Sequence, residues 1–315
     1  MSGPWQRLRA LWPGWTILAP LPFFLHAAWS LSQGRFHGEN AAVLALVAVL
    51  FVGGPRAKRL FLGFYPLGLV GLFYDTMRVV QQVGVTADRV HLCDLRATEL
   101  ALFGVDVDGR RVTLHDWFQA HPSPVLDAVC AVPYSTFIFV CIACAIWLYL
   151  RDYRRMLRFT WCFFALNVAG FVTYHLYPAA PPWYFHAHGC NVDVLAHASE
   201  GPALARVDAR LGLHYFAGMY GRSASVFGAM PSLHCAYPLL VLLQGWPTFG
   251  RPWRIAAAAF FALMCFSAVY LDHHWVLDAL GGITYCLIVV VAARALDRRR
   301  RGSAEDRPAV TGEAP

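Results

Sequence analysis

Long apolar runs separated by short polar connections dominate the chain and predict membrane-spanning helices. A transmembrane helix needs about 20 mostly apolar residues, within a range of roughly 17–25. The second of the runs is short and could re-enter the membrane from one side. The pattern predicts an all-α, polytopic transmembrane helical bundle of about eight spans, at residues 15–31, 41–54, 60–80, 125–150, 159–177, 231–246, 255–271 and 275–296.

Composition agrees with this pattern. The chain of 315 residues is 58% hydrophobic and 14% charged, whereas a soluble domain carries about 25% charged residues. An ordinary soluble protein is therefore excluded. The first apolar run follows arginines, as in a signal peptide, but residues 25–30 make a poor cleavage site and many spans follow. This favours a retained first span.

Basic residues lie in short clusters between the apolar runs and give the chain a formal net charge of +7. A nucleic-acid-binding protein would gather such charge on one face or along one helix, so no nucleic-acid partner is expected. Clusters beside spans mark the cytoplasmic side, and an even number of spans places every cluster there. The clusters fall at residues 7–9, 56–59, 151–158, 251–254 and 298–301.

Two long polar connections, residues 82–123 and 179–227, then face the other side of the membrane. Each carries one cysteine, Cys93 in the first and Cys190 in the second. In an oxidising compartment these two thiols could pair and tie the connections together. The remaining cysteines lie in or beside apolar runs and act most simply as small hydrophobic residues.

Histidine and aspartate side chains interrupt two of the apolar runs at the same predicted membrane depth. The stretch "GAMPSLHCAY" places His234 in the first turn of a helix that Pro231 begins, and "LDHHWVLDALGG" places His274 four residues before Asp278. Each histidine alone could be an interfacial residue satisfied by water or a carbonyl group. Ionisable groups at this depth are costly and usually functional, and residues four apart share a helix face. Asp278 could therefore orient one ring nitrogen of His274 and leave the other free to attack or to take a proton.

These stretches resemble the second and third motifs of the type 2 phosphatidic acid phosphatase superfamily. "PSLH" ends at His234 and "HHWVLD" ends at Asp278. The longer stretches "FGAMPSLH" and "YPAAPPWY" are most similar to the inositol phosphorylceramide synthase branch, the aureobasidin-target family. The likeness covers roughly residues 60–290. High alanine and arginine usage and the short tail indicate a bacterial member.

The resemblance implies a covalent phosphohistidine mechanism that needs no metal or cofactor. His274 would attack phosphorus, Asp278 would orient it, and His234 would protonate the departing alcohol and deprotonate the incoming one. His186 and His188 are then expected at the rim of the substrate site, since a zinc site normally shows three or four protein ligands. Activity is expected to be bell-shaped around neutral pH, because attack needs a neutral His274 and departure needs a protonated His234.

The basic residues that hold phosphate in the phosphatases of this superfamily are absent here. Ala268 stands where they carry an arginine before the nucleophile, and no lysine–arginine motif precedes "APPW". Charge must come from elsewhere, such as the helix N-terminus at Ser232. Arg222 could equally be a solvated loop residue, and Arg78 could equally pair with Asp75 within the membrane. The expected substrate contacts are Ser232, Arg222, His188, Arg78 and Trp183. Trp183 is also expected in an aromatic belt at the membrane interface.

The leading prediction is a membrane phosphotransferase. It would move a phosphoalcohol headgroup, phosphoinositol, from a phosphatidylinositol-like donor to the hydroxyl group of a ceramide or diacylglycerol. One alternative is a lipid phosphate phosphatase, which the missing basic residues disfavour, and the other is a lipid-binding scaffold without activity. The predicted organisation is N-terminal spans in residues 1–59, a catalytic transmembrane domain in 60–297 and a disordered cytoplasmic tail in 298–315. A bacterial inner membrane would place the site at the periplasmic face.

Overall fold

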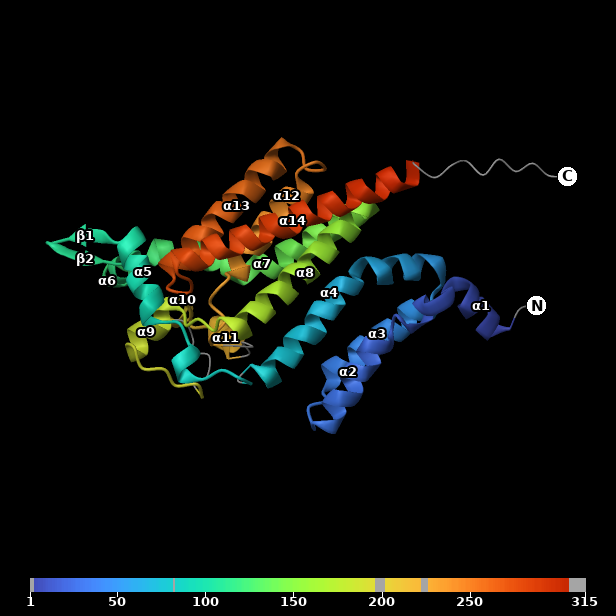
Figure 1. Cartoon of the computed structure of the whole chain (residues 1–315), viewed down its shortest axis with the longest axis horizontal. Coiled ribbons are helices and arrows are strands. Elements are labelled where there is room, and N and C mark those ends of the chain that lie inside the picture. The colour runs from blue at the N-terminus through green and yellow to red at the C-terminus, as the bar shows by residue number, and fades with distance from the viewer. Residues whose placement is uncertain (1–2, 82, 196–201, 222–225, 306–315) are drawn as a thin grey trace.

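The computed structural model describes residues 3–81, 83–195, 202–221 and 226–305, most of which are helical (Figure 1). The all-α prediction is confirmed, because each predicted apolar run contains one main helix. These helices are α2 (Leu21–Ser32), α3 (Gly38–Val52), α4 (Gly54–Val80), α7 (Pro124–Arg151), α8 (Tyr153–Leu176), α12 (Leu233–Gly245), α13 (Arg251–Tyr270) and α14 (Val276–Glu305). Five of them are long and apolar enough to cross a membrane: α4, α7, α8, α13 and α14.

The first predicted span is divided in the structure. Within the predicted residues 15–31, Pro20 separates a 3₁₀ helix (Gly14–Leu18) from α2, and Pro13 separates the same 3₁₀ helix from α1 (Pro4–Leu11), which precedes the predicted span. Proline lacks a backbone N–H and disfavours helical geometry in the residue before it, so this apolar run does not form one continuous helix. As a result, α2 has only 12 residues.

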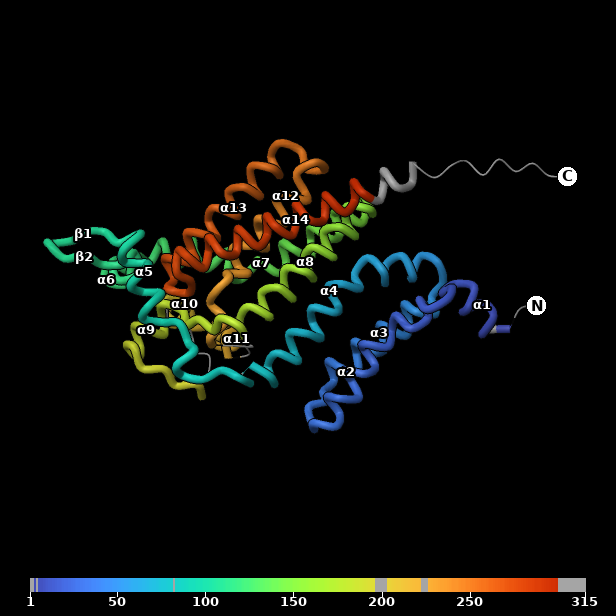
Figure 2. The backbone as a smooth tube through the Cα atoms, viewed as in Figure 1, coloured from blue at the N-terminus to red at the C-terminus, as the bar shows by residue number. Residues whose placement is uncertain are grey.

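Helix α12 forms the centre of the bundle and packs against α7, α8, α13 and α14. The main apolar core joins it to α7 and α8 through the fully buried side chains of Leu148, Phe159, Leu166 and Leu240. Helix α4 packs on α8, and α3 packs on α4 (Figure 2). The N-terminal helices therefore lie at one side of the bundle, separated from α12 by α4 and α8.

The first long polar connection, residues 82–123, forms a folded unit. Its hairpin turns at Asp108 and Gly109, which both have positive φ (49° and 75°), as two-residue Asp-Gly turns require. One helix of the second connection packs beside it. We call these elements together the cap: α5 (Cys93–Phe103), β1 (Val105–Val107), β2 (Arg110–Val112), α6 (Leu114–Ala120) and α9 (Pro182–His188).

The cap and the basic clusters lie at opposite ends of the bundle. In Figure 1 the hairpin, α5, α6 and α9 gather at the end remote from α1 and from the end of α14. The basic clusters occupy the start of α4, the junction of α7 and α8, the start of α13 and the end of α14. Such a separation is what the positive-inside rule requires of a multi-pass chain, and the protein is an integral membrane protein.

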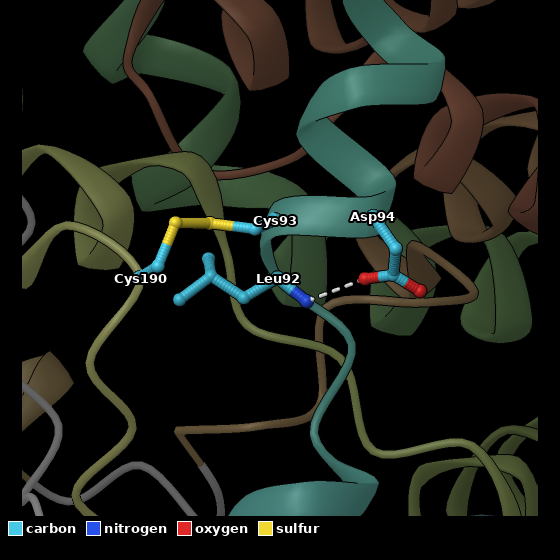
Figure 3. Close-up of a disulfide and its surroundings, with 4 residues drawn as sticks. All are labelled: Leu92, Cys93, Asp94 and Cys190. Atoms are coloured by element: carbon cyan, nitrogen blue, oxygen red, sulfur yellow. Dashed lines mark hydrogen bonds between the residues drawn. A yellow bond between two sulfur atoms is a disulfide. The ribbon is translucent and has the colours of Figure 1, made fainter.

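A disulfide bond joins the two polar connections. Cys93 at the start of α5 is bonded to Cys190 after α9 (Figure 3), and their Cα atoms lie 5.7 Å apart. The predicted pairing is confirmed. Beside it, the N–H of Leu92 donates to the carboxylate of Asp94 at 2.9 Å, which fixes the start of α5. The other seven cysteines are free.

Extended backbone segments join the remote sequence motifs beside the cap. The N–H of Ala179 donates to the carbonyl of Phe227 at 2.9 Å, and the N–H of Ala229 donates back to the carbonyl of Ala179 at 3.0 Å. On the other edge, the N–H of His91 donates to the carbonyl of Pro178 at 2.8 Å. These bonds place "YPAAPPWY" directly against "FGAMPSLH".

Two short helices, α10 (Pro202–Leu211) and α11 (Tyr215–Tyr220), complete the cap end of the molecule. Asp127 at the start of α7 is buried and accepts hydrogen bonds from Arg206 and Arg210 of α10, each at 2.9 Å. Because two cations share one buried carboxylate, α10 is held firmly on α7.

Candidate active site

The stretch "PSLH" forms the entry to α12. Ser232 is the N-cap, and its hydroxyl accepts from the N–H of Cys235 at 3.3 Å. Its own N–H donates to the backbone carbonyl of Asp278 at 2.9 Å. Pro231 follows a cis peptide bond and lies one residue before the N-cap Ser232, whereas the sequence placed Pro231 inside the helix. His234 is therefore the second residue of α12, and the fully buried Ser232 holds two motifs together instead of facing a substrate.

The stretch "HHWVLD" forms a tight turn between α13 and α14. The N–H groups of His273 and His274 both donate to the carbonyl of Ala268, at 3.1 and 3.0 Å. Asp272 has a φ of 65°, a left-handed conformation that aspartate adopts more readily than most residues. Because α14 begins at Val276, His274 stands just before the helix and not on the helix face that the four-residue spacing predicted.

His234 and His274 face each other across these two elements. The Nδ1 atom of His234 lies 3.0 Å from the Nε2 atom of His274. The Nδ1 atom of His274 lies 3.0 Å from the carbonyl oxygen of Ala229, which can only accept, so this nitrogen carries the proton. The Nε2 atom of His274 therefore presents its lone pair, and His234 donates to it. The sequence could not reveal the role of Ala229, because a backbone carbonyl carries no residue-specific signal.

Asp278 lies close to His274 without a hydrogen bond to its ring. Its Oδ2 atom is 3.6 Å from Nδ1 of His274 and accepts instead from the N–H of Trp275 at 2.9 Å. The hydrogen bond that the sequence assigned to Asp278 is thus made by Ala229. Asp278, which is fully buried, caps the first turn of α14 and places a carboxylate beside the ring.

Aromatic rings enclose the histidines. Tyr134 stacks on both His234 and His273, with ring centroids 4.9 and 5.0 Å away, and Tyr220 stacks on His273 at 4.7 Å. Sequence reasoning missed these tyrosines, because an aromatic residue in an apolar helix gives no sign of which neighbour it will meet. Together they remove the imidazoles from water.

Burial sets the charge of His274. It lowers the pKa of this imidazole from 6.5 to about 4; the bond to Ala229 opposes this effect and the nearby His115 strengthens it. At neutral pH His274 is therefore uncharged. A neutral imidazole with one nitrogen protonated and a lone pair on the other is the form that can act as a nucleophile.

A cavity of about 570 Å³ opens beside the histidines and runs into the bundle. Phe163 and Tyr174 of α8 both line it, and at 1.5 Å per residue their separation corresponds to about 16 Å along the helix. Its wall is mainly apolar; where Asn167 lines it, the amide oxygen accepts from the hydroxyl of Tyr237 at 2.6 Å. An apolar cavity of this shape suits a hydrocarbon chain whose polar end meets His234 and His274.

Helix α14 approaches the "PSLH" turn very closely. A Cβ atom added at Gly282 would lie 2.0 Å from the backbone oxygen of Ser232, whereas one added at Gly281 would meet only ordinary contacts at 3.6 Å. Only glycine fits at position 282 without a shift of the backbone. This contact brings the start of α12 and the start of α14, and with them both histidines, to one place.

Comparison with known proteins agrees with this geometry. The family model described as "PAP2 superfamily" matches residues 105–292, more than half of the chain and both histidine turns. The chain belongs to the PAP2 superfamily. The predicted resemblance is confirmed.

Several PAP2-superfamily relatives carry names from sphingolipid synthesis. The chain is 33% identical over 254 residues to a phosphoinositol dihydroceramide synthase of Bacteroides thetaiotaomicron, covering 79% of this chain and 82% of that protein. It is 27% identical over 287 residues to the inositol phosphorylceramide synthase of Candida albicans, covering 84% of this chain and 58% of that protein. To the inositol phosphorylceramide synthase catalytic subunit AUR1 of Saccharomyces cerevisiae it is 32% identical over 130 residues, 39% of this chain and 31% of that protein. No solved structure gives a significant match.

Two of the predicted substrate contacts on α9 lie elsewhere in this PAP2-superfamily chain. Trp183 is only 7% exposed, and its backbone N–H donates to the backbone carbonyl of Asp272 at 3.0 Å. The predicted place of Trp183 in an interfacial belt is therefore wrong. His188 is exposed at the end of α9, where its ring meets Tyr184. Neither lines the cavity beside the histidines. A helix of seven residues turns its side chains in all directions, and the linear motif did not say which would face the site.

The predicted arginine contacts are not brought to the histidines either. Arg78 lies 3.9 Å from Asp75. This is the ion pair that the sequence offered as the alternative to a substrate contact. Arg78 also lines a separate cavity among α2, α3 and α4. Arg222 lies outside the described residues. Ala268, at the position where the superfamily's phosphatases carry an arginine, is fully buried and holds the histidine turn through its carbonyl. Among the residues that the structure describes, no group of three or more His, Cys, Asp or Glu is placed to hold a metal ion.

Proposed function

We propose that this chain transfers phosphoinositol from a phosphatidylinositol donor to the hydroxyl group of a ceramide or dihydroceramide. The observation that carries the proposal is the contact between His234 and His274 at the mouth of an apolar cavity. The names of the relatives supply the headgroup and the acceptor. The residue roles below are part of the proposal.

In the first step, the Nε2 lone pair of His274 attacks the phosphorus of the donor. An N–P bond forms and the P–O bond to diacylglycerol breaks, while His234, which enters this step protonated on both ring nitrogens, gives one proton to the departing oxygen and becomes neutral. Asp278, 3.6 Å from the ring, stabilises the positive charge that the imidazole gains. The product of this step is a phosphoinositol group on His274 and free diacylglycerol.

In the second step, the acceptor hydroxyl attacks the same phosphorus. His234, now neutral, takes the hydroxyl proton, the new P–O bond forms and the N–P bond to His274 breaks. One phosphodiester replaces another, so the exchange requires no nucleotide. The enzyme's main tasks are to align both lipids with His274 and to keep water from the phosphohistidine.

The surroundings of His274 favour a lipid acceptor over water. Tyr134 and Tyr220 cover the neighbouring rings of His234 and His273, and the apolar wall of the cavity disfavours water and offers room for a hydrocarbon chain. A phosphodiester carries less charge than the monoester that a phosphatase would bind. The partial positive charge at the N-terminus of α12, beside His234, is a suitable partner for it. A lipid phosphate phosphatase is the second candidate and is less well supported.

We further propose that the protein resides in a bacterial inner membrane with the site at the periplasmic face. The cap lies opposite the basic clusters, which belong on the cytoplasmic side. It also carries the disulfide, and such bonds persist in oxidising compartments. Residues 60–297 would form the catalytic domain, with the spans of residues 1–59 packed at its side and residues 298–315 as a cytoplasmic tail.

The purified protein in lipid nanodiscs tests this function. With inositol-labelled phosphatidylinositol and ceramide, mass spectrometry should show labelled phosphoinositol-ceramide together with an equal amount of diacylglycerol. Activity on phosphatidic acid with release of inorganic phosphate, and none with ceramide, would instead establish a phosphatase. An identical lipid profile for wild type and His274→Ala would show that the protein does not catalyse either reaction.

A further inference from the structure

Charged side chains form a continuous series from the surface of the cap to the turn that carries His274. Successive members lie 2.6–3.8 Å apart, and their charges alternate in sign when both histidines are protonated. Those nearest the turn are fully buried. In order, the series consists of Arg96, Asp116, His186, Asp272, His115 and Glu99.

Glu99 ends the series at the N-terminus of α14. Its Oε1 atom accepts from the N–H of Val276 at 2.8 Å, and its Oε2 atom accepts from the N–H of Leu277 at 3.3 Å. The first N–H groups of a helix have no partner within the helix, and a carboxylate is also favoured there by the helix dipole. Glu99 thereby fixes the residues that directly follow the histidine turn.

Asp272 fixes the same turn from its other side. Its Oδ1 atom lies 3.4 Å from the ring of His115, and its Oδ2 atom lies 2.6 Å from the ring of His186. Asp272 precedes His274 by two residues, and Glu99 holds the start of α14 two residues after it. The nucleophile proposed above therefore stands between two points that are both anchored by the cap.

We propose that Glu99 and His115 are positioning residues for His274: through the series of charges, the cap holds the turn that presents the nucleophile. This inference rests on the proposed function, since positioning matters to the reaction only if His274 reacts. The cap disulfide has the same effect, because it ties the start of α5, which carries Glu99, to the end of α9.

The charges of the two cap histidines suit this role. Burial alone would lower the pKa of His115, but Asp272 and Glu99 outweigh burial and raise this pKa. Burial also opposes protonation of His186, yet the two carboxylates that it bridges raise its pKa to about 9. His186 is therefore cationic at neutral pH, and the two carboxylates beside His115 favour the cationic form of that imidazole. Burial is the main cause of the low pKa of His274, and the nearby His115 lowers it further, which favours the nucleophilic form.

A merely stabilising function would not call for this arrangement. Buried ion pairs add little net stability, because the cost of removing charges from water offsets their attraction. Apolar contacts would hold the cap on the bundle equally well. Here Glu99 instead holds the start of α14, and Asp272, itself part of the histidine turn, is held by His115 and His186 of the cap.

The variant Glu99→Gln tests the inference in nanodiscs. It removes the negative charge and one acceptor with little change of volume. The kcat for headgroup transfer should fall on the order of 10²-fold, the loss expected when a reacting group is misplaced by about 1 Å. The KM for both lipids should stay within about twofold, because the cavity is untouched. Glu99→Asp, which keeps the charge, should recover part of kcat. Asp106→Asn, an exposed carboxylate of the cap hairpin, is the matched control and should behave as wild type.

Hydrogen exchange gives a readout that does not depend on activity. In Glu99→Gln the amides of Val276 and Leu277 should exchange at least about tenfold faster than in wild type, as expected when a terminal helix amide loses its partner. Unchanged exchange, or an unchanged kcat in the folded variant, would overturn the inference.

If wild type transfers no headgroup, the proposed function fails, and the exchange data still decide whether Glu99 holds the turn. If Glu99→Gln does not fold, His186→Gln at the less buried end of the series replaces it and should lower kcat roughly tenfold at constant KM; an unchanged kcat would reject the inference.

Discussion

The Nδ1 atom of His234 lies 3.0 Å from the Nε2 atom of His274, although the two residues are 40 positions apart in the sequence. A hydrogen bond at this contact needs one donor and one acceptor, so the two facing nitrogens share a single proton. The carbonyl of Ala229 fixes which ring presents the lone pair. In the proposed reaction, the two histidines would therefore start with the acid and the nucleophile already distinguished.

Removal of either histidine should abolish headgroup transfer, because the two act as one unit. His274→Ala and His234→Ala should each lower kcat by at least about 10³-fold, and the double variant should lose no more than His274→Ala alone. Transfer of labelled inositol in nanodiscs provides the measurement. His37→Ala is the control, since His37 is exposed before α3 on the far side of the bundle. Independent, multiplicative losses in the double variant would contradict a shared role.

The acid limb of the pH profile should lie well below that of an ordinary histidine. His274 must be neutral to attack, and burial lowers its pKa from 6.5 to about 4. Because the neutral form persists until the pH falls to that value, the loss of kcat/KM that follows protonation of His274 should begin only below about pH 5 and proceed with unit slope towards 4. The sequence alone placed this limb near neutrality. A limb centred near 6.5, in protein that circular dichroism shows to be folded, would mean that His274 is not the group that must be neutral.

Substitution of Gly282 should disturb the site far more than substitution of its neighbour. In Gly282→Ala the new Cβ would lie 2.0 Å from the backbone oxygen of Ser232, so α14 must move away from α12. Overpacking of this kind costs about 1–3 kcal/mol, and kcat should fall at least about tenfold because the histidines separate. Gly281→Ala, whose Cβ meets contacts at 3.6 Å, is the matched control. Thermal unfolding in detergent and the transfer assay measure both effects, and equal behaviour of the two variants would refute the close approach.

The disulfide predicts a definite count of reactive thiols. The chain has nine cysteines, of which Cys93 and Cys190 are bonded and seven are free. Alkylation under denaturing conditions should therefore add seven labels without reduction and nine after reduction, as measured by intact mass. Protein expressed in a reducing cytoplasm and never exported serves as the control and should give nine in both cases. Nine labels on the exported protein before reduction would exclude the bond.

The sequence supplied the residue types of the proposed site but not their partners. "PSLH" and "HHWVLD" identified His234, His274 and Asp278, because the motifs are local and their residues are contiguous. The same local view assigned the hydrogen bond of His274 to Asp278, four residues away, whereas the carbonyl of Ala229, 45 residues away, makes it. It also took Trp183 for an interfacial residue, although this indole is buried within the cap.

Sequence by itself determined what depends on the character of successive residues. The lengths of the apolar runs predicted the helices, and the basic clusters predicted which helix ends lie together. The tertiary structure decided everything that depends on contact between remote segments, such as the bond of Glu99 to Val276 across 177 residues. A buried carboxylate and a helix N-terminus can be paired in many ways along a chain. Only the packing of the cap on the bundle, where an unpaired charge would be too costly, selects one of them.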